Sequence, residues 1–196
     1  MGLLVEYAPF RPTITESRSR PGVFEVTGVM QRANSKNQNG RIYSKDVLYR
    51  EVQNYINQYV KIGNAYGELD HPDSPVVSLK NASHVIKELW WDGDNLMGKV
   101  ELLNTPSGNI VKEIIIGGHT IGISSRGTGS VRQVGENTLM VQDDFELVCW
   151  DFVSNPSTHG AFMNPMSLNE ATERALDKYA KVHQLVSEIL NTPLKG

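Results

Sequence analysis

Apolar residues along this chain recur with two periods, one typical of helices and one typical of strands. After Ser44 they recur every three or four positions, which predicts an amphipathic helix that ends near Gly63. The residues on this stripe are Val47, Leu48, Val52, Tyr55, Ile56, Tyr59 and Val60. A second helix is predicted from the N-cap Thr105 to the glycines at 117–118, with Pro106 in its first position.

The middle of the chain favours strands. Residues 24–30 are rich in β-forming side chains, and residues 82–103 predict a hairpin. Residues 120–124 predict a short strand followed by a glycine-rich turn, and a further hairpin is predicted to pivot on residues 135–137. Residues 145–153 are apolar on both faces of a two-residue repeat, which predicts a central, buried strand.

The two ends of the chain differ from this strand-rich centre. Residues 8–22 contain three prolines among arginines and serines with little apolar content, which favours an extended or mobile arm rather than a core element. We therefore expect an arm at residues 1–22, one folded domain at 23–165, and a C-terminal helix at 166–196 that begins near Ser167.

Composition excludes several classes of protein. Hydrophobic residues make up 39% of the 196 residues, and Gly and Pro are near ordinary usage, which argues against collagen-like and fully disordered chains. Nineteen basic against 22 acidic residues give a net charge of −3, without the basic surface typical of nucleic-acid binders. The single Cys149 cannot form an internal disulfide. No apolar run approaches the ~20 residues of a membrane span, and the start lacks the pattern of a signal peptide, so we expect a soluble, cytoplasmic protein without a membrane or nucleic-acid partner.

One candidate for chemistry is His71, which follows a short strand and precedes Pro72. Histidine can take and return a proton near neutral pH, but a single loop histidine can equally have a surface or capping role. His71 and three carboxylate or imidazole residues near it in the sequence could suggest a metal site. Their spacing gives no pair of ligands on one face of a helix, so no metal is expected. These residues are Asp70, His71, Asp73 and His84.

Ser124 and Ser125 end an apolar strand just before several glycines. A nucleophilic serine needs such a rigid position with backbone N–H groups nearby to hold an oxyanion, and we assign that role to the backbone around Ser125 and Arg126. The alternative is a glycine-rich turn whose serines bond local backbone groups. A phosphate-binding loop is a third alternative, but this sequence lacks the Lys-Ser/Thr pair that ends such a loop. Strand alternation places Ser125 with Ile121 and Ile123, and Ser124 on the other face with Gly122.

Asp151 lies in the predicted buried strand between two aromatic residues. A buried carboxylate must meet a cation, accept several hydrogen bonds or orient a histidine, and a structural ion pair would satisfy it equally well. A serine, a histidine and a buried aspartate are nevertheless the set that an acyl-transfer triad requires. The spacing of His71, Ser124 and Asp151 is compatible with such a triad but does not establish it.

The ordered set of motifs in residues 23–156 resembles the prohead, or capsid-maturation, serine proteases of T-even-type tailed phages, whose fold is similar to that of herpesvirus assembly proteases. The motifs are Asn39-Gly40-Arg41-Ile42-Tyr43, Gly67-Glu68-Leu69-Asp70-His71-Pro72, Glu88-Leu89-Trp90-Trp91, Ser124-Ser125-Arg126-Gly127-Thr128-Gly129-Ser130, and Asp151 ahead of Asn155-Pro156-Ser157. The resemblance implies His71 as base, Ser124 as nucleophile and Asp151 as third member, with no cofactor.

The same resemblance implies an α+β fold, a mostly antiparallel β-barrel with peripheral helices. It implies an endopeptidase that cleaves scaffold, core and capsid proteins inside the assembling prohead in the host cytoplasm, with a homo-oligomer as a further possibility. A non-catalytic prohead scaffold component and a metal-dependent hydrolase centred on Asp70 and His71 remain as alternatives.

The resemblance further implies self-cleavage after Glu, where an aliphatic residue stands two positions before and a small residue follows. Two bonds fit this pattern, Glu16–Ser17 and Glu170–Ala171. We expect the first to be open to attack within the arm, and the second to be held by a capping box formed by Ser167 and Glu170.

Overall fold

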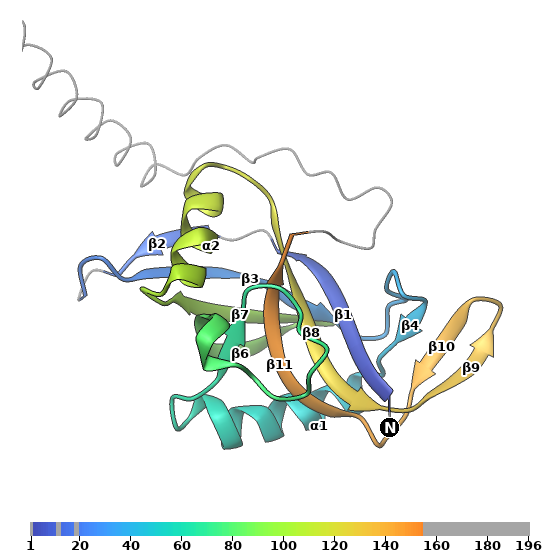
Figure 1. Cartoon of the computed structure of the whole chain (residues 1–196). Coiled ribbons are helices and arrows are strands. Elements are labelled where there is room, and N and C mark those ends of the chain that lie inside the picture. Colours follow the sequence, from blue (N-terminus) through green and yellow to red (C-terminus); the bar gives the residue numbers. More distant parts are fainter. Residues whose placement is uncertain (1, 11–12, 18–19, 155–196) are drawn as a thin grey trace, which may run out of the picture. The chain divides into compact units, whose positions relative to one another are not determined.

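The computed structural model describes residues 2–10, 13–17 and 20–154, so the predicted C-terminal helix lies outside the described residues. The described chain is mostly β-strand with two α-helices, which confirms the α+β class (Figure 1). The strands are β1 (Gly2–Phe10), β2 (Thr13–Glu16), β3 (Phe24–Arg32), β4 (Arg41–Ile42), β5 (Tyr66–Glu68), β6 (Ala82–Asp92), β7 (Asn95–Leu102), β8 (Ile121–Gly129), β9 (Val131–Gly135), β10 (Thr138–Val141) and β11 (Glu146–Val153). The α-helices are α1 (Lys45–Tyr55), which a π-helical turn at Ile56–Val60 continues, and α2 (Pro106–Ile116), and a short 3₁₀ helix lies at Leu79–Asn81.

The described strands form three sheets, ordered β2-β3-β7-β6-β5, β1-β8-β11 and β4-β10-β9. Every pairing is antiparallel except that of β4 with β10, which is parallel. One hydrophobic core takes side chains from all three sheets and from both α-helices. The sheets are not closed into a barrel, so the mostly antiparallel architecture is confirmed for the described residues but the expected closed barrel is not seen.

Both helices begin where their capping residues predict. The hydroxyl of Ser44 accepts a hydrogen bond from the N–H of Val47, and Thr105 caps α2 in the same way. Four residues of the predicted stripe are buried in α1, namely Val47, Leu48, Val52 and Tyr55, whereas Tyr59 beyond this helix is 37% exposed. Glu51 of α1 accepts a hydrogen bond from the N–H of Leu147 in β11 at 3.3 Å. This bond fixes α1 against the strand that carries Asp151. No helix among the described residues is long and apolar enough to span a bilayer.

The glycine-rich turn predicted after Ser124 is wrong, because β8 runs without a break from Ile121 to Gly129. A Cβ atom on Gly127 would lie 2.5 Å from the ring of Phe145, and one on Gly129 would lie 3.0 Å from the Cα of that residue. Gly127 therefore makes room for the buried ring of Phe145 and Gly129 for the backbone of that residue, and neither turns the chain.

The expectation that residues 1–22 have no place in the folded core is also wrong. Gly2–Phe10 pairs with β8 along its whole length, and Leu4 is 5% exposed within the hydrophobic core. Thr13–Glu16 pairs with β3 at the edge of the five-stranded sheet. The partners of β1 lie more than 100 positions away, so a local pattern of prolines and polar residues could not reveal the pairing.

The strand predicted at 145–153 is buried as expected, but it lies at the edge of its sheet, and β8 is the central strand. The segment after β5 covers this edge: Leu69 forms a parallel bridge with Phe152, and the N–H of Asp70 donates to the carbonyl of Phe152 at 2.8 Å. In Figure 1 the green segment between β5 and β6 passes in front of β11. The edge of β11 is therefore covered at Phe152, next to Asp151.

Candidate active site

Ser124 and Asp151 lie opposite one another on neighbouring strands. The antiparallel register of β8 and β11 places Ser124 beside Asp151 and Ser125 beside Trp150. Side chains of directly opposed residues share a face of the sheet, so Ser124 and Asp151 point to the same side. Ser125 points to the other side together with Ile123. The face alternation predicted for the two serines is confirmed.

His71 reaches this pair from the loop after β5. Asp70 has a φ of +64°, a left-handed conformation that Asp tolerates better than most residues, and it turns the chain over β11. The Nδ1 atom of His71 then lies 2.8 Å from the Oδ2 atom of Asp151. Two of the three predicted triad members are therefore hydrogen-bonded although they stand 80 positions apart.

The Nε2 atom of His71 and the Oγ atom of Ser124 are both buried and have no hydrogen-bond partner among the described residues. When the carboxylate of Asp151 accepts from Nδ1–H, Nε2 carries the lone pair that can take a proton from a hydroxyl. The described structure thus brings the three residues together without a hydrogen bond between Ser124 and His71. Ser124 is 1% exposed, so a peptide carbonyl reaches its Oγ only after the covering residues move.

Asp151 is fully buried, and its environment favours the ionised form. The carboxylate accepts from His71, from the backbone N–H of Glu68 at 2.9 Å, and from the guanidinium of Arg126. Burial alone would raise the pKa of Asp151, but the hydrogen bonds from His71 and Glu68 and the charge of Arg126 outweigh it and hold this pKa below its usual value. Asp151 is therefore an acceptor that can fix the orientation of His71.

The side chains of Arg126 and Glu68 are fully buried beside Asp151. Neither side chain was predicted from the sequence to have a role in the site. Their guanidinium and carboxylate lie 2.9 Å apart. A sequence signal was present, because Arg126 stands two positions after Ser124 and shares its face of β8. A charged residue on that face of a buried strand requires a buried partner.

The assignment of oxyanion donors to the backbone of Ser125 and Arg126 loses its basis. It relied on a glycine-rich turn that would leave these N–H groups unpaired, but both residues lie inside β8, between β1 and β11. Backbone groups of a central strand are used in the ladders on its two sides. Successive N–H groups of a strand also point to opposite sides, one toward β1 and one toward β11, so these two cannot hold the same oxyanion while β8 keeps this conformation.

His84 is a second histidine near this cluster. It is fully buried, its Nδ1 lies 2.9 Å from the hydroxyl of Ser83, and its ring packs edge-on against Phe152. Burial lowers the pKa of His84 to about 4, so the ring is neutral at physiological pH. The described residues contain no group of three or more His, Cys, Asp or Glu side chains placed to hold a metal ion.

The structure holds the proposed cleavage bond between Glu16 and Ser17 in place. Glu16 ends β2 and accepts a hydrogen bond from the N–H of Gly22 at 2.8 Å, and the N–H of Ser17 donates to the carbonyl of Val23 at 2.7 Å. The Glu16–Ser17 bond is therefore held within folded structure, whereas a free arm was expected to leave it open to attack. Glu170 and Ala171 lie outside the described residues.

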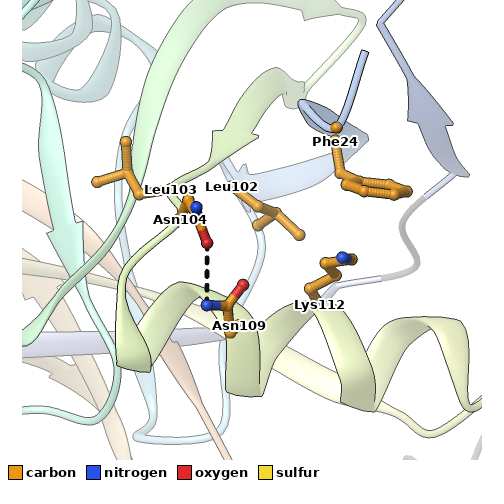
Figure 2. Close-up of a pocket in the computed structure, with 7 residues that line it drawn as sticks. Phe24, Leu102, Leu103, Asn104, Asn109 and Lys112 are labelled. Atoms are coloured by element: carbon orange, nitrogen blue, oxygen red, sulfur yellow. Dashed lines mark hydrogen bonds between the residues drawn. The ribbon is translucent and has the colours of Figure 1, made fainter.

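A surface hollow of about 220 Å³ lies beside α2, between that helix and the ends of β3 and β7. Figure 2 shows Asn109 donating to Asn104, at 3.1 Å, and Lys112 beside the ring of Phe24, with a nitrogen-to-centroid distance of 4.4 Å. None of the predicted catalytic residues lines this hollow, which separates it from the chemistry of the triad.

Comparisons with known proteins find relatives that cover most of this chain. Residues 12–173 match the family described as prohead core protein serine protease. A prohead core protein protease of Enterobacteria phage T4 is 32% identical over 164 residues, which cover 82% of this chain and 77% of that protein. The solved structure of the bacteriophage T4 capsid assembly protease is similar with a TM-score of 0.73 and 28% identity, covering 79% of this chain and 98% of that one.

Proposed function

This chain belongs to the family of prohead core protein serine proteases, and on that premise we propose that Ser124, His71 and Asp151 are its catalytic triad. The observation that carries the proposal is the placement of Asp151, which lies directly across from Ser124 and is hydrogen-bonded to Nδ1 of His71. The two atoms that must exchange a proton, Oγ of Ser124 and Nε2 of His71, are both without another partner among the described residues.

The geometry supports a two-step hydrolysis. The Oγ atom of Ser124 attacks the carbonyl carbon of the scissile peptide while Nε2 of His71 takes its proton, and Asp151 stabilises the resulting imidazolium. His71 returns that proton to the leaving amine as the C–N bond breaks, which leaves an ester on Ser124. Water then attacks the ester carbonyl while His71 takes a proton from it. The C–O bond to Ser124 breaks as His71 returns that proton to Oγ, which releases the acyl group as a carboxylic acid and restores the free serine.

The substrates that we propose are the scaffold, core and capsid proteins of a phage prohead, cleaved after Glu within the assembling particle in the host cytoplasm. The support is that the family consists of prohead core proteases and that the similar T4 sequence and structure are those of a prohead core protease and a capsid assembly protease. An internal location also suits a nucleophile that is 1% exposed, because a high local concentration of substrate favours rare open states.

Covalent labelling with a serine-directed fluorophosphonate tests the triad. We expect one label on the native protein, located at Ser124 by peptide mass spectrometry, because only an activated hydroxyl attacks the reagent. Unfolded protein serves as the control and should remain unlabelled. Absence of label on active, folded protein at every pH, or loss of activity to a chelator, would contradict a serine mechanism.

We further propose self-cleavage after Glu16 and after Glu170, which would separate residues 1–16, with β1 and β2, and residues 171–196, most of the predicted C-terminal helix, from the rest of the protein. The first cut requires β2 to leave β3, but β2 has only four residues at a sheet edge, and such elements open readily. The second requires loss of a predicted helix cap worth about 0.5–2 kcal/mol. We expect cleavage after Glu16 to come first.

Intact-mass measurement of concentrated protein over several hours checks this order. The Glu16→Gln variant should lose the first fragment, whereas Glu25→Gln, on the paired strand β3, should keep it. Protein with Ser124→Ala should stay whole. Active protein that yields no fragment at either bond would remove self-cleavage from the proposal.

A further inference from the structure

Arg126 holds the segment that carries His71 on both sides. Its Nη2 atom donates to Oε1 of Glu68 at 2.9 Å, and its Nη1 atom donates to the carbonyl oxygen of Ser74. Glu68 stands three residues before His71, and Ser74 stands three residues after it. The same oxygen of Glu68 accepts from the N–H of Ser78 at 2.9 Å, which closes the loop. One buried guanidinium therefore ties both flanks of the His71 loop to β8, in addition to the contacts of Leu69 and Asp70 with Phe152.

Arg126 also balances two buried carboxylates. Glu68 and Asp151 both have 0% side-chain exposure, and Arg126 pairs with each of them. Two carboxylates that share a buried site without a cation cannot both remain ionised. A protonated Asp151 would no longer stabilise an imidazolium, and its hydrogen-bonding role toward His71 would change.

We propose that Arg126 is a positioning residue for peptide hydrolysis, which keeps Asp151 ionised and holds the His71 loop over β11. The proposal rests on the triad proposed above. Arg126 touches neither the substrate nor the transferred proton in this scheme. It acts on the reaction through Asp151, to which Nε donates at 3.0 Å and Nη2 at 3.2 Å, and through the loop bonds to Glu68 and Ser74.

Among the described residues that surround Asp151, Arg126 is the group that always carries a positive charge. The titratable groups that act on Asp151 or feel its charge come from six elements or loops of the fold. They are Tyr55 of α1, Glu68 of β5, His71 of the following loop, His84 of β6, Arg126 of β8 and Cys149 of β11. Burial holds His84 neutral, and burial raises the pKa of Cys149, so its thiol also stays uncharged.

A charge-rescue experiment tests the role of Arg126. In Arg126→Met, Asp151 loses the cation that favours its ionised form, so the acidic limb of the pH profile of kcat/KM should move to higher pH. We expect kcat to fall about 100-fold, the loss typical of a displaced catalytic group, with KM within a few-fold of the parent value. The double variant Arg126→Met with Glu68→Gln removes one charge of each sign, and it should return the acidic limb and recover part of kcat.

Two further variants keep the test decisive if Arg126→Met does not fold. Arg126→Lys keeps the cation but cannot bond Asp151, Glu68 and Ser74 at once, so kcat should fall while the acidic limb stays in place. Glu68→Gln should move that limb to lower pH, because it removes an anion beside Asp151. The proposal would be overturned if Arg126→Lys kept the parent kcat and Glu68→Gln kept the parent acidic limb of the pH profile. It would also be overturned if the double variant were less active than Arg126→Met.

The parent protein separates this inference from the proposed triad. If the parent shows no activity that depends on Ser124, the triad is wrong before any Arg126 variant is considered. If the parent is active, Ser124→Ala is inactive and Arg126→Met has the parent kcat and pH profile, the triad stands and only the role of Arg126 fails.

Discussion

Ser124→Ala is expected to abolish peptide hydrolysis and leave the fold intact. Loss of the nucleophile in a serine triad lowers kcat by about six orders of magnitude, and only substrate binding and other groups support the remaining rate. The Oγ atom of Ser124 has no hydrogen-bond partner among the described residues, so its removal breaks no bond that holds β8 to its neighbours. Turnover of a peptide substrate, with thermal unfolding as the check on folding, measures both parts of this prediction.

Ser125→Ala is the matched control for Ser124→Ala. Ser125 stands next in the chain and is equally buried, but its side chain faces the opposite side of the sheet, away from Asp151. Its hydroxyl also lacks a partner among the described residues, so the change to alanine should be nearly neutral for stability. We expect it to retain much of the parent rate. An inactive Ser125→Ala beside an active Ser124→Ala would reverse the assignment of the nucleophile.

Local features of the structure were predictable from local sequence. The caps Ser44 and Thr105 set the starts of the two helices, because a side-chain oxygen there satisfies an N–H that the helix leaves unpaired. The alternation that separates Ser124 from Ser125 is equally local, since neighbouring side chains in a strand point to opposite faces. The sequence could therefore choose between the two serines without knowledge of the partner strand.

Features that depend on distant partners were not predictable in the same way. Gly127 reads as a turn residue until Phe145 is known to lie against it, and β1 reads as an arm until β8 is known to pair with it. The role of the Arg126 side chain depends on Glu68 and Asp151, which join it from two other strands. For Asp151, the sequence left open whether its partner is a histidine or a cation, and the structure supplies both.

Asp151→Asn is expected to lower kcat by about four orders of magnitude, as the corresponding change does in other serine triads. An amide has one acceptor oxygen and one NH₂ group, whereas Asp151 accepts at both oxygens. Its Oδ2 faces His71 and Arg126, and its Oδ1 faces the N–H of Glu68. Either orientation of the amide therefore sets a donor against a donor, which misplaces the imidazole and removes the charge that stabilises it.

The same change should also lower stability, with a dependence on pH whose sign follows from the pKa of Asp151. This pKa is held below its unfolded value, so the ionised carboxylate stabilises the fold above the unfolded pKa of about 4 and loses that contribution as the pH falls through the folded pKa. Asp151→Asn should therefore cost on the order of 1–3 kcal/mol of unfolding free energy near pH 7 and progressively less below pH 4. Urea unfolding across this range measures it, with Asp143→Asn, an exposed carboxylate just before the same strand, as the control. Turnover is compared at a pH at which both proteins are folded. A variant with parent turnover would remove Asp151 from the mechanism, and one with parent stability at every pH would remove it from the buried ion cluster.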